Sequence, residues 1–418
     1  MRAWWTMLIA RSARRIGLRL VAFALGAVAL ALLAGAASSW VPSSVEVDLG
    51  QDSVQTLLEI LATSMLAVTT FSLTAMISAY ASAAAASTPR ATQLLVEDQT
   101  SQRALSTFLG AFVFSVVGIA ALSTEYYGDQ GRVLMYAGTL LVIGIVVVTL
   151  LRWIHHLVTF GRMADVLDRV EDAARDAACA AMRDPHLGAA APVTVPHSAW
   201  TVRATATGIV TALDVAALER AAASHDAVIH LLLRPGAAVG RGEPLARVEG
   251  AERDALAGAI RSAVLVERHR TYEQDPRLGL VALAEIGSRA LSPAVNDPGT
   301  AIEALNAIHR TVAAILETAP DAAPPTECRV HVPAVLFADL LEDALRPLAR
   351  DGAGTIEVGL RLQKVVGALA ANADEPEASD LREASRRAER RALDALTDPR
   401  DRAVIESAAR AARGEAPA

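Results

Sequence analysis

The sequence predicts a membrane protein that combines four transmembrane α-helices with a mixed α/β, mainly helical cytoplasmic domain containing a small β-module. Hydrophobic residues make up 53% of the 418 residues, which is high for a soluble protein. Before residue 155 they form long runs without charge, and beyond it charged residues recur every few positions. This asymmetry divides the chain into a membrane half and a soluble half.

Four apolar runs are long enough to cross a bilayer, which takes about 20 residues in a helix. We expect a transmembrane domain over residues 1–159, with spans at about 18–39, 58–81, 104–124 and 133–154. A cleaved signal peptide is the alternative for the first run, because "AGAASSW" resembles a cleavage site. The other three runs predict a membrane protein in either case.

The distribution of arginine predicts the orientation, since cytoplasmic loops are enriched in Lys and Arg. Five arginines precede the first span, and the loop after that span has acidic residues but neither Lys nor Arg. The next cytoplasmic loop carries Arg90 and Arg103, and Arg152 and Arg162 follow the fourth span. We therefore expect both termini on the cytoplasmic side of a bacterial inner (plasma) membrane.

The second span is unusual because hydroxyl residues recur at every fourth position on one helical face. They are Thr70, Thr74, Ser78 and Ser82. One interpretation is a polar face that lines a water-filled path in an oligomer. The other is close helix packing through small residues, with the hydroxyls bonded to their own helix.

A connecting helix and a linker are expected over residues 160–198, with the helix nearly continuous with the fourth span. Residues 199–250 then alternate in a strand-like manner and predict a small β-rich module. This module resembles the half-barrel of biotinyl and lipoyl carrier domains, in which a lysine carries the cofactor. The module has no lysine, so covalent attachment is excluded; a structural role and a ligand pocket both remain open.

The remainder, residues 251–418, predicts a helical domain with one short strand in "ECRVHV". The expected helices span residues 251–261, 276–291, 298–317, 334–348, 355–371, 378–396 and 400–413.

The dipeptide Asp-Pro occurs four times and is read here as a helix-start signal, because Asp is a favoured N-cap and Pro suits the first helical position. It occurs at Asp184, Asp275, Asp297 and Asp398. Since Pro293 disfavours helical geometry at Ser292, the stretch "SPAVNDPGT" predicts a turn between two helices.

This turn does not by itself explain the charged residues of the preceding helix. Glu285 and Arg289 lie four residues apart, a spacing that permits an ion pair. Arg289 can cap carbonyl groups at the helix end, or it can bind an anion at the start of the next helix. We therefore treat Glu285, Arg289, Asn296 and Asp297 as a candidate anion-binding or structural site.

A family resemblance rests on these same segments. The stretch "RTYEQDPRLGLVALAEIGSRALSPAVNDPGTAIEALNAI", the preceding "RPGAAVGRGEPLARV" and the four spans resemble a large bacterial family of predicted membrane proteins, catalogued as domain of unknown function 2254. The resemblance extends over nearly the whole chain. It implies a location and an architecture, and it assigns no activity or site residue.

Composition and motifs exclude several function classes. The net charge of −7 provides no basic face for nucleic acid. The single lysine, Lys364, forms no P-loop, and Cys179 and Cys328 form no zinc-binding spacing. His155 and His156 are adjacent and point apart on a helix. The sequence therefore predicts a protein that is not an enzyme and has no cofactor or metal.

Two function classes remain. We expect a homo-oligomer in the lipid bilayer that acts as a channel or permeation protein, gated by its cytoplasmic domain. The alternative is a membrane-anchored ligand sensor or scaffold without transport activity. The sequence does not identify a small-molecule ligand.

Overall fold

The computed structural model describes residues 21, 24–26, 28–29, 51–96, 98–124, 129–252, 254–321 and 328–416. Its chain contacts define two compact units. Of the described residues, the membrane unit holds those up to Ala86 and those between 92 and 165. The soluble unit holds residues 87–91 and the described residues from Val166 onward, so the short segment that follows the first long helix packs with the soluble unit.

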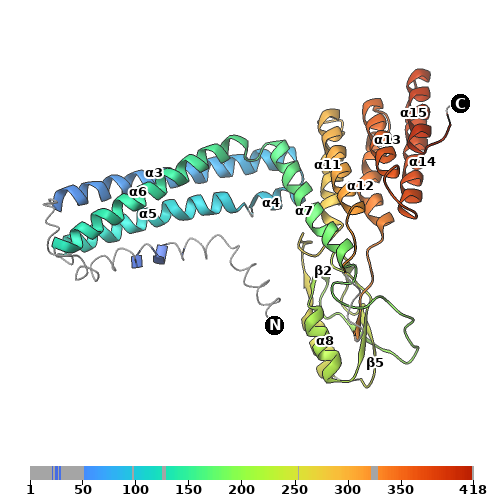
Figure 1. Ribbon diagram of the computed structural model, residues 1–418, viewed down its shortest axis with the longest axis horizontal. Helices are drawn as coiled ribbons and strands as arrows, with labels where there is room; N and C mark the ends of the chain where they lie inside the picture. Colours follow the sequence, from blue (N-terminus) through green and yellow to red (C-terminus); the bar gives the residue numbers. More distant parts are fainter. Residues whose placement is uncertain are drawn as a thin grey trace. The chain divides into compact units, whose positions relative to one another are not determined.

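The membrane unit is built from helices that run alongside one another (Figure 1). They are α3 (Gln51–Ala86), α4 (Pro89–Val96), α5 (Gln99–Ser123) and α6 (Asp129–Thr159). In the part of the chain that the structure describes, three helical segments are long and apolar enough to cross a membrane. They are Ser53–Ala85, Pro89–Ser123 and Arg132–Thr159.

The predicted first span, residues 18–39, lies largely outside the described residues. Within it, residues 21, 24–26 and 28–29 are described, and they are helical. The second, third and fourth predicted spans coincide with α3, α5 and α6. The count of four therefore stays a prediction.

Large side chains fill the space between α3, α5 and α6. Trp153, Phe108, Phe114, Leu58 and Met135 are at most 1% exposed. The outward faces of α3 and α6 carry exposed Leu, Ile, Val and Phe side chains, as expected of helices that face hydrocarbon. The described part of this unit is therefore packed around an apolar interior.

The soluble unit begins with α7 (Met163–Arg183) and a β-module. Within the described residues, the strands form a sheet of order β1-β5-β3-β7 and a second of order β4-β2-β6. The elements are β1 (Trp200–Arg203), β2 (Gly208–Leu213), α8 (Val215–Ser224), β3 (Val228–Leu231), β4 (Ala238–Val239), β5 (Pro244–Glu249), α9 (Asp254–Ala263), β6 (Val264–Glu267) and β7 (Val330–His331).

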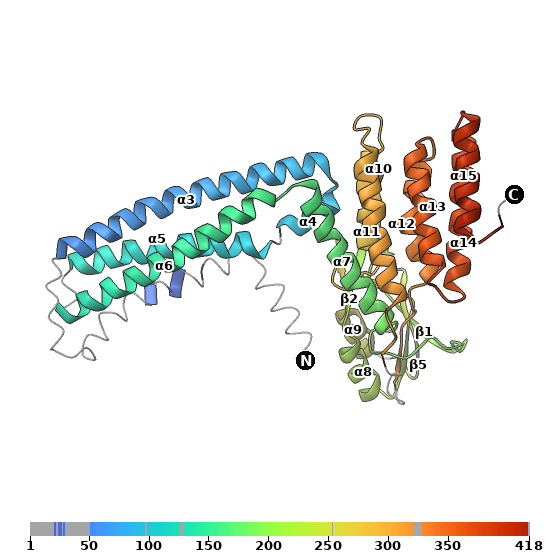
Figure 2. The ribbon, with the colours of Figure 1, turned by 45° about the horizontal axis from the view of Figure 1, so that its top comes forward.

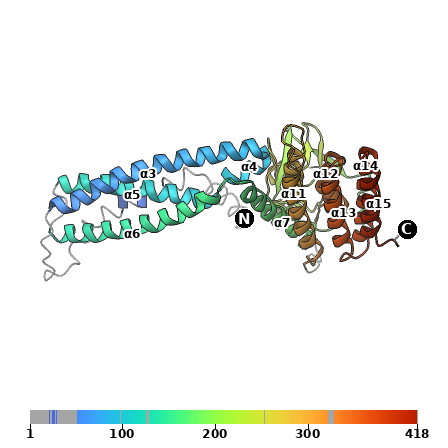
Figure 3. The same ribbon diagram turned by 90° about the horizontal axis from the view of Figure 1, so that it is seen from above.

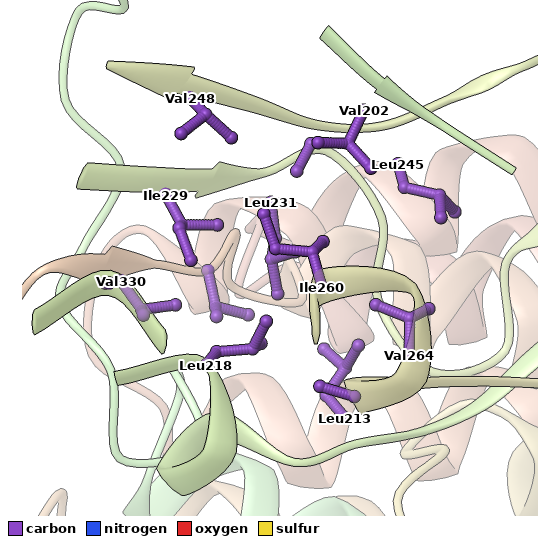
Figure 4. Packing of buried hydrophobic residues seen from close by; sticks show 14 of the residues in the cluster. Val202, Leu213, Leu218, Ile229, Leu231, Leu245, Val248, Ile260, Val264 and Val330 are labelled. Atoms are coloured by element: carbon purple, nitrogen blue, oxygen red, sulfur yellow. The ribbon is translucent and has the colours of Figure 1, made fainter. Parts of the chain in front are cut away.

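The core of the β-module joins both sheets to its two helices (Figure 4). Leu218 of α8 and Ile260 of α9 pack with Ile229, Val248 and Val330 of the four-stranded sheet, and all five are fully buried. The module expected over residues 199–250 thus extends further. Strands β6 and β7 complete its sheets, because β7 pairs in parallel with β3 although it is distant in sequence.

The rest of the soluble unit is a two-layered array of helices (Figures 2 and 3). Helices α10, α12 and α14 pack in sequence in one layer, and α11, α13 and α15 pack in the other. They are α10 (Leu278–Ala290), α11 (Pro298–Leu316), α12 (Phe337–Asp351), α13 (Ile356–Ala370), α14 (Glu377–Ala395) and α15 (Pro399–Ala412). These bounds confirm the predicted helices to within a few residues.

Two sequence-based expectations are wrong. The fourth span does not continue into the connecting helix, because α6 ends at Thr159 and α7 begins at Met163. Between them Gly161 adopts a left-handed φ of 76° and lies against Ala79, a conformation that favours glycine. In addition, Asp184-Pro185 starts no helix and lies in a turn.

One helix contact in the soluble unit depends on a glycine. A Cβ on Gly279 of α10 would collide with the backbone and side chain of Ala174 in α7. The two helices therefore approach closely at this point, and the Arg310–Glu171 ion pair, with Nε–Oε1 at 2.7 Å, links α7 to α11 nearby in the fold.

We expect Gly279→Ala to destabilise the soluble unit by about 1–3 kcal/mol, because α7 and α10 must move apart to admit the methyl group. Gly258→Ala is the matched control. Gly258 lies inside α9 with open space at its Cβ position, so alanine there is expected to stabilise by about 0.5–1 kcal/mol. Thermal unfolding of the full-length protein in detergent measures both; equal shifts in Tm would contradict the close contact.

Candidate functional site

The hydroxyl face of α3, defined as Thr70, Thr74, Ser78 and Ser82, is exposed in the described protomer. The residues that α3 buries against α5 and α6 include Leu58, Met65 and Met76. At about 100° per residue, the centres of the two faces lie about 150° apart around the helix. The described helices of the protomer therefore leave the hydroxyl face uncovered.

The threonines of this face use their protons within α3. Thr70 Oγ1 donates to the Leu66 carbonyl oxygen at 2.5 Å, and Thr74 Oγ1 donates to that of Thr70 at 3.0 Å. Each hydroxyl oxygen keeps lone pairs that point outward and can accept from water or contact a cation. The face is thus a row of acceptors without a formal charge.

The segment directly after α3 is held by the soluble unit. The guanidinium of Arg90 forms an ion pair with Glu285 of α10, and the Tyr272 hydroxyl donates to the Arg90 carbonyl oxygen at 2.9 Å. Burial, together with the negative charge of Glu285, raises the pKa of Tyr272. The phenol therefore stays protonated and remains a donor at neutral pH.

The structure gives Glu285 a partner that the sequence did not indicate. The expected spacing permitted a pair with Arg289, but the ion pair that Glu285 forms in the described residues is with Arg90, 195 positions away. Its second oxygen, Oε2, is buried and has no hydrogen-bond partner among the described residues. Arg289 lies exposed in the last turn of α10.

Asn296 and Asp297 are explained by the turn itself. Asn296 has a left-handed φ of 50°, which Asn tolerates better than most residues. Asp297 caps α11 by accepting from the Thr300 backbone N–H at 3.1 Å and from the Thr300 hydroxyl at 2.6 Å. Both are exposed, and the turn accounts for each of them without a ligand. The grouping of Glu285, Arg289, Asn296 and Asp297 into one site stays a prediction.

A polar cluster in the membrane unit was missed by sequence reasoning. Asp98, which is 6% exposed, caps α5 by accepting from the Ser101 backbone N–H at 2.6 Å. His156 of α6 lies 3.0 Å from the same carboxylate, Nε2 to Oδ2. The rings of Trp153 and Phe160 flank His156, and together these contacts join the start of α5 to the end of α6.

One signal for this cluster was present in the sequence. "DQTS", with Asp three residues before Ser and an apolar run behind it, is a helix-start pattern. The sequence does not reveal that His156 completes the site, because its partner lies 58 positions away.

Metal-binding and thiol chemistry have no structural support in the described residues. No group of three His, Cys, Asp or Glu side chains there is arranged to hold a metal ion. Cys179 is buried, and burial together with the charge of Glu219 raises the pKa of Cys328 above that of an ordinary thiol. A raised pKa makes a thiol less nucleophilic at neutral pH.

The cap at Asp297 gives a direct test of the turn. Hydrogen bonds from the Thr300 hydroxyl and backbone N–H lower the pKa of Asp297, so its stabilising effect is present above the unfolded pKa of about 4 and is lost as pH falls. At pH 7, Asp297→Ala is expected to cost about 1 kcal/mol. Asp297→Asn, which can still cap, should cost less in the same unfolding assay. Equal losses would argue against the cap.

Comparison with known proteins places the chain in a family. No curated protein and no solved structure matches it. A family model described as "Predicted membrane protein (DUF2254)" matches residues 14–368. This range includes α3, α5 and α6, the β-module and the turn between α10 and α11. The chain therefore belongs to the DUF2254 family of predicted membrane proteins.

Proposed function

We propose that this protein is an oligomeric channel or permeation protein of a bacterial inner membrane, with both termini in the cytoplasm. The observation that carries the proposal is the exposure of Thr70, Thr74, Ser78 and Ser82 on a membrane helix whose other face is packed. Hydroxyl groups that face lipid chains form no hydrogen bonds with them, whereas water in a path would hydrogen-bond to the same hydroxyl oxygens.

The proposed path runs between protomers. Aromatic and aliphatic side chains fill the interior of the described helices, so a route through one protomer has no room among them. If α3 helices from several copies surround an axis, their hydroxyl oxygens supply a ring of acceptors at each level. Phe71, which is 68% exposed, lies on the same side of α3 and would form a narrow apolar ring.

The proposed gate acts through the segment 87–91. This segment continues directly from α3, and the soluble unit holds it through Glu285 and Tyr272. A shift of α10 or of the loop that carries Tyr272 would therefore pull on the end of the path-lining helix. We infer that this contact takes a second arrangement when the path opens, and that the cytoplasmic domain gates the path in this way.

The hydroxyl face is tested by flux into liposomes. We expect Thr70→Leu with Thr74→Leu to reduce flux of monovalent ions by about tenfold or more, because leucine removes the acceptors and narrows the path. The control is Val147→Leu with Val148→Leu on the exposed face of α6, which should leave flux unchanged. Oligomeric state and Tm are measured for both variants to exclude misfolding.

Absence of flux for the wild-type protein across a broad panel of ions and small solutes would overturn the channel proposal. The alternative, a membrane-anchored sensor or scaffold, would then account for the same fold.

The gate is tested by exchanging the charges of one ion pair. Arg90→Glu should change the flux by about threefold or more, because it places like charges together and releases the end of α3. Adding Glu285→Arg should restore flux towards the wild-type value. Arg346→Glu, which breaks an exposed pair with Glu342 on α12, is the control. If the double exchange behaves like Arg90→Glu, the pair does not control the gate.

A further inference from the structure

A cavity of about 320 Å³ lies in the soluble unit where the β-module meets the helical array. Its wall includes the turn Arg234–Ala237, the side chains of Arg270 and Arg277, and the start of α12 with Asp339. Ligand sites in proteins have volumes from about 300 Å³ upward. The cavity is therefore of a size for a compact ligand.

Arg234 brings a positive charge to this wall, and in the described residues its Nη1 donates to backbone carbonyls rather than to a carboxylate. Its Nη1 donates to the carbonyl oxygens of Pro185 at 2.8 Å and Pro333 at 2.6 Å. Its Nη2 is buried and has no hydrogen-bond partner among the described residues. Burial lowers the pKa of Arg234, against the opposing effect of Asp275 and Asp184, which is the mark of a desolvated guanidinium.

The other two arginines are held rigidly. Asp275 is 1% exposed and receives Arg270 through Nε at 2.6 Å and Nη2 at 2.9 Å. Arg277 likewise donates to Asp343 at two points, from Nε at 2.5 Å and from Nη2 at 2.9 Å. Each guanidinium keeps Nη1 outside its two-point pair, so positively charged donors are fixed in place before any ligand arrives.

Two helices also begin at the cavity wall. The N-cap residues of α10 and α12 are Arg277 and Leu336, and neither supplies a capping side chain. The first turn of a helix carries unpaired N–H groups and the positive end of the helix dipole. At α10 the carboxylate of Asp275 already accepts from the Arg277 backbone N–H at 3.1 Å, whereas the N-cap residue of α12 makes no side-chain cap. The start of α12 therefore favours an anion, and phosphate is a frequent occupant of such positions.

We propose that this cavity binds a phosphate group, carried either by a small soluble phosphate monoester or by the headgroup of an anionic lipid. The Nη1 groups of Arg270 and Arg277 and the start of α12 give donors from several directions, and the desolvated guanidinium of Arg234 adds positive charge behind them. This arrangement suits the tetrahedral oxygens of phosphate. Asp339, 3.9 Å from Arg277 Nη1 and half-exposed, lines the same wall and competes with the anion for that guanidinium.

The phosphate site is connected to the proposed gate through one loop, and this connection matters only if the proposed function holds. The loop between β6 and α10 carries Arg270 and Pro276 at the cavity and Tyr272 at the Arg90 carbonyl. Only a few residues separate these contacts. Phosphate bound to Arg270 therefore acts on the same loop whose Tyr272 holds the segment that follows α3.

Binding is tested on the full-length protein in neutral detergent, by following Tm against increasing inorganic phosphate or glycerol 3-phosphate. Chloride at equal ionic strength controls for screening. Nanodiscs of phosphatidylcholine with or without phosphatidic acid form the lipid arm. We expect saturable stabilisation in at least one arm, and the arm that responds identifies the source of the phosphate group.

Three variants locate the binding. Arg277→Gln should weaken the apparent affinity by about tenfold, and Asp339→Asn should strengthen it by about threefold because it removes a competing negative charge. Arg346→Gln, on the far part of α12, should leave it unchanged. Opposite effects of the first two variants cannot arise from general destabilisation, which would weaken both.

The proposal is overturned if no arm stabilises the protein beyond chloride, or if all three variants respond to phosphate alike. The assay involves no flux, so it separates the two proposals. A protein that conducts ions but does not bind phosphate refutes this site alone, and a protein that binds phosphate but never conducts refutes only the channel.

Discussion

Buried and membrane-embedded polar groups must find partners inside the protein, and this constraint shapes both units. In hydrocarbon no water replaces a lost hydrogen bond. In the packed interior of the membrane unit, Thr139 therefore bonds to its own helix at 2.8 Å, and the indole of Trp153 donates to Ser72 at 2.9 Å. The contact between Asp98 and His156 follows the same rule, because each ionisable side chain finds its partner inside the membrane unit.

In the soluble unit, arginine side chains are the partners of several buried or partly buried carboxylates. The pairs Arg310–Glu171, Arg277–Asp343 and Arg270–Asp275 are all two-point contacts that link separate elements or fix a loop. Two-point geometry restricts the orientation of both partners. Arg234 departs from this pattern because its acceptors are backbone carbonyls, and it does so at the wall of a cavity.

The segment 87–91 connects the membrane helix of the proposed path to the unit that contains the proposed phosphate site. The segment 87–91 continues from a helix with an uncovered hydroxyl face and belongs to the unit that contains the cavity. The ion pair of Arg90 and the hydrogen bond of Tyr272 are its attachments. Tyr272 is buried, which shields its hydrogen bond from water and strengthens it, whereas the ion pair of Arg90 is exposed to solvent. A local event in the soluble unit thus has a physical connection to a membrane helix.

Local patterns in the sequence determined the elements of this fold. Apolar run length located α3, α5 and α6, and helical periodicity located α10 to α15. Asp caps located the starts of α11 at Asp297 and α15 at Asp398. These signals act over a few residues, so the sequence carries them directly. The hydroxyl face of α3 was also visible, since it depends only on a four-residue repeat.

Tertiary structure alone decided which distant residues meet. Arg90 with Glu285, Asp98 with His156, and β7 with β3 are contacts between positions that no local pattern relates. The break between α6 and α7 also lies at a tertiary contact, where Gly161 packs against Ala79. Packing free energy outweighs local preference where elements touch.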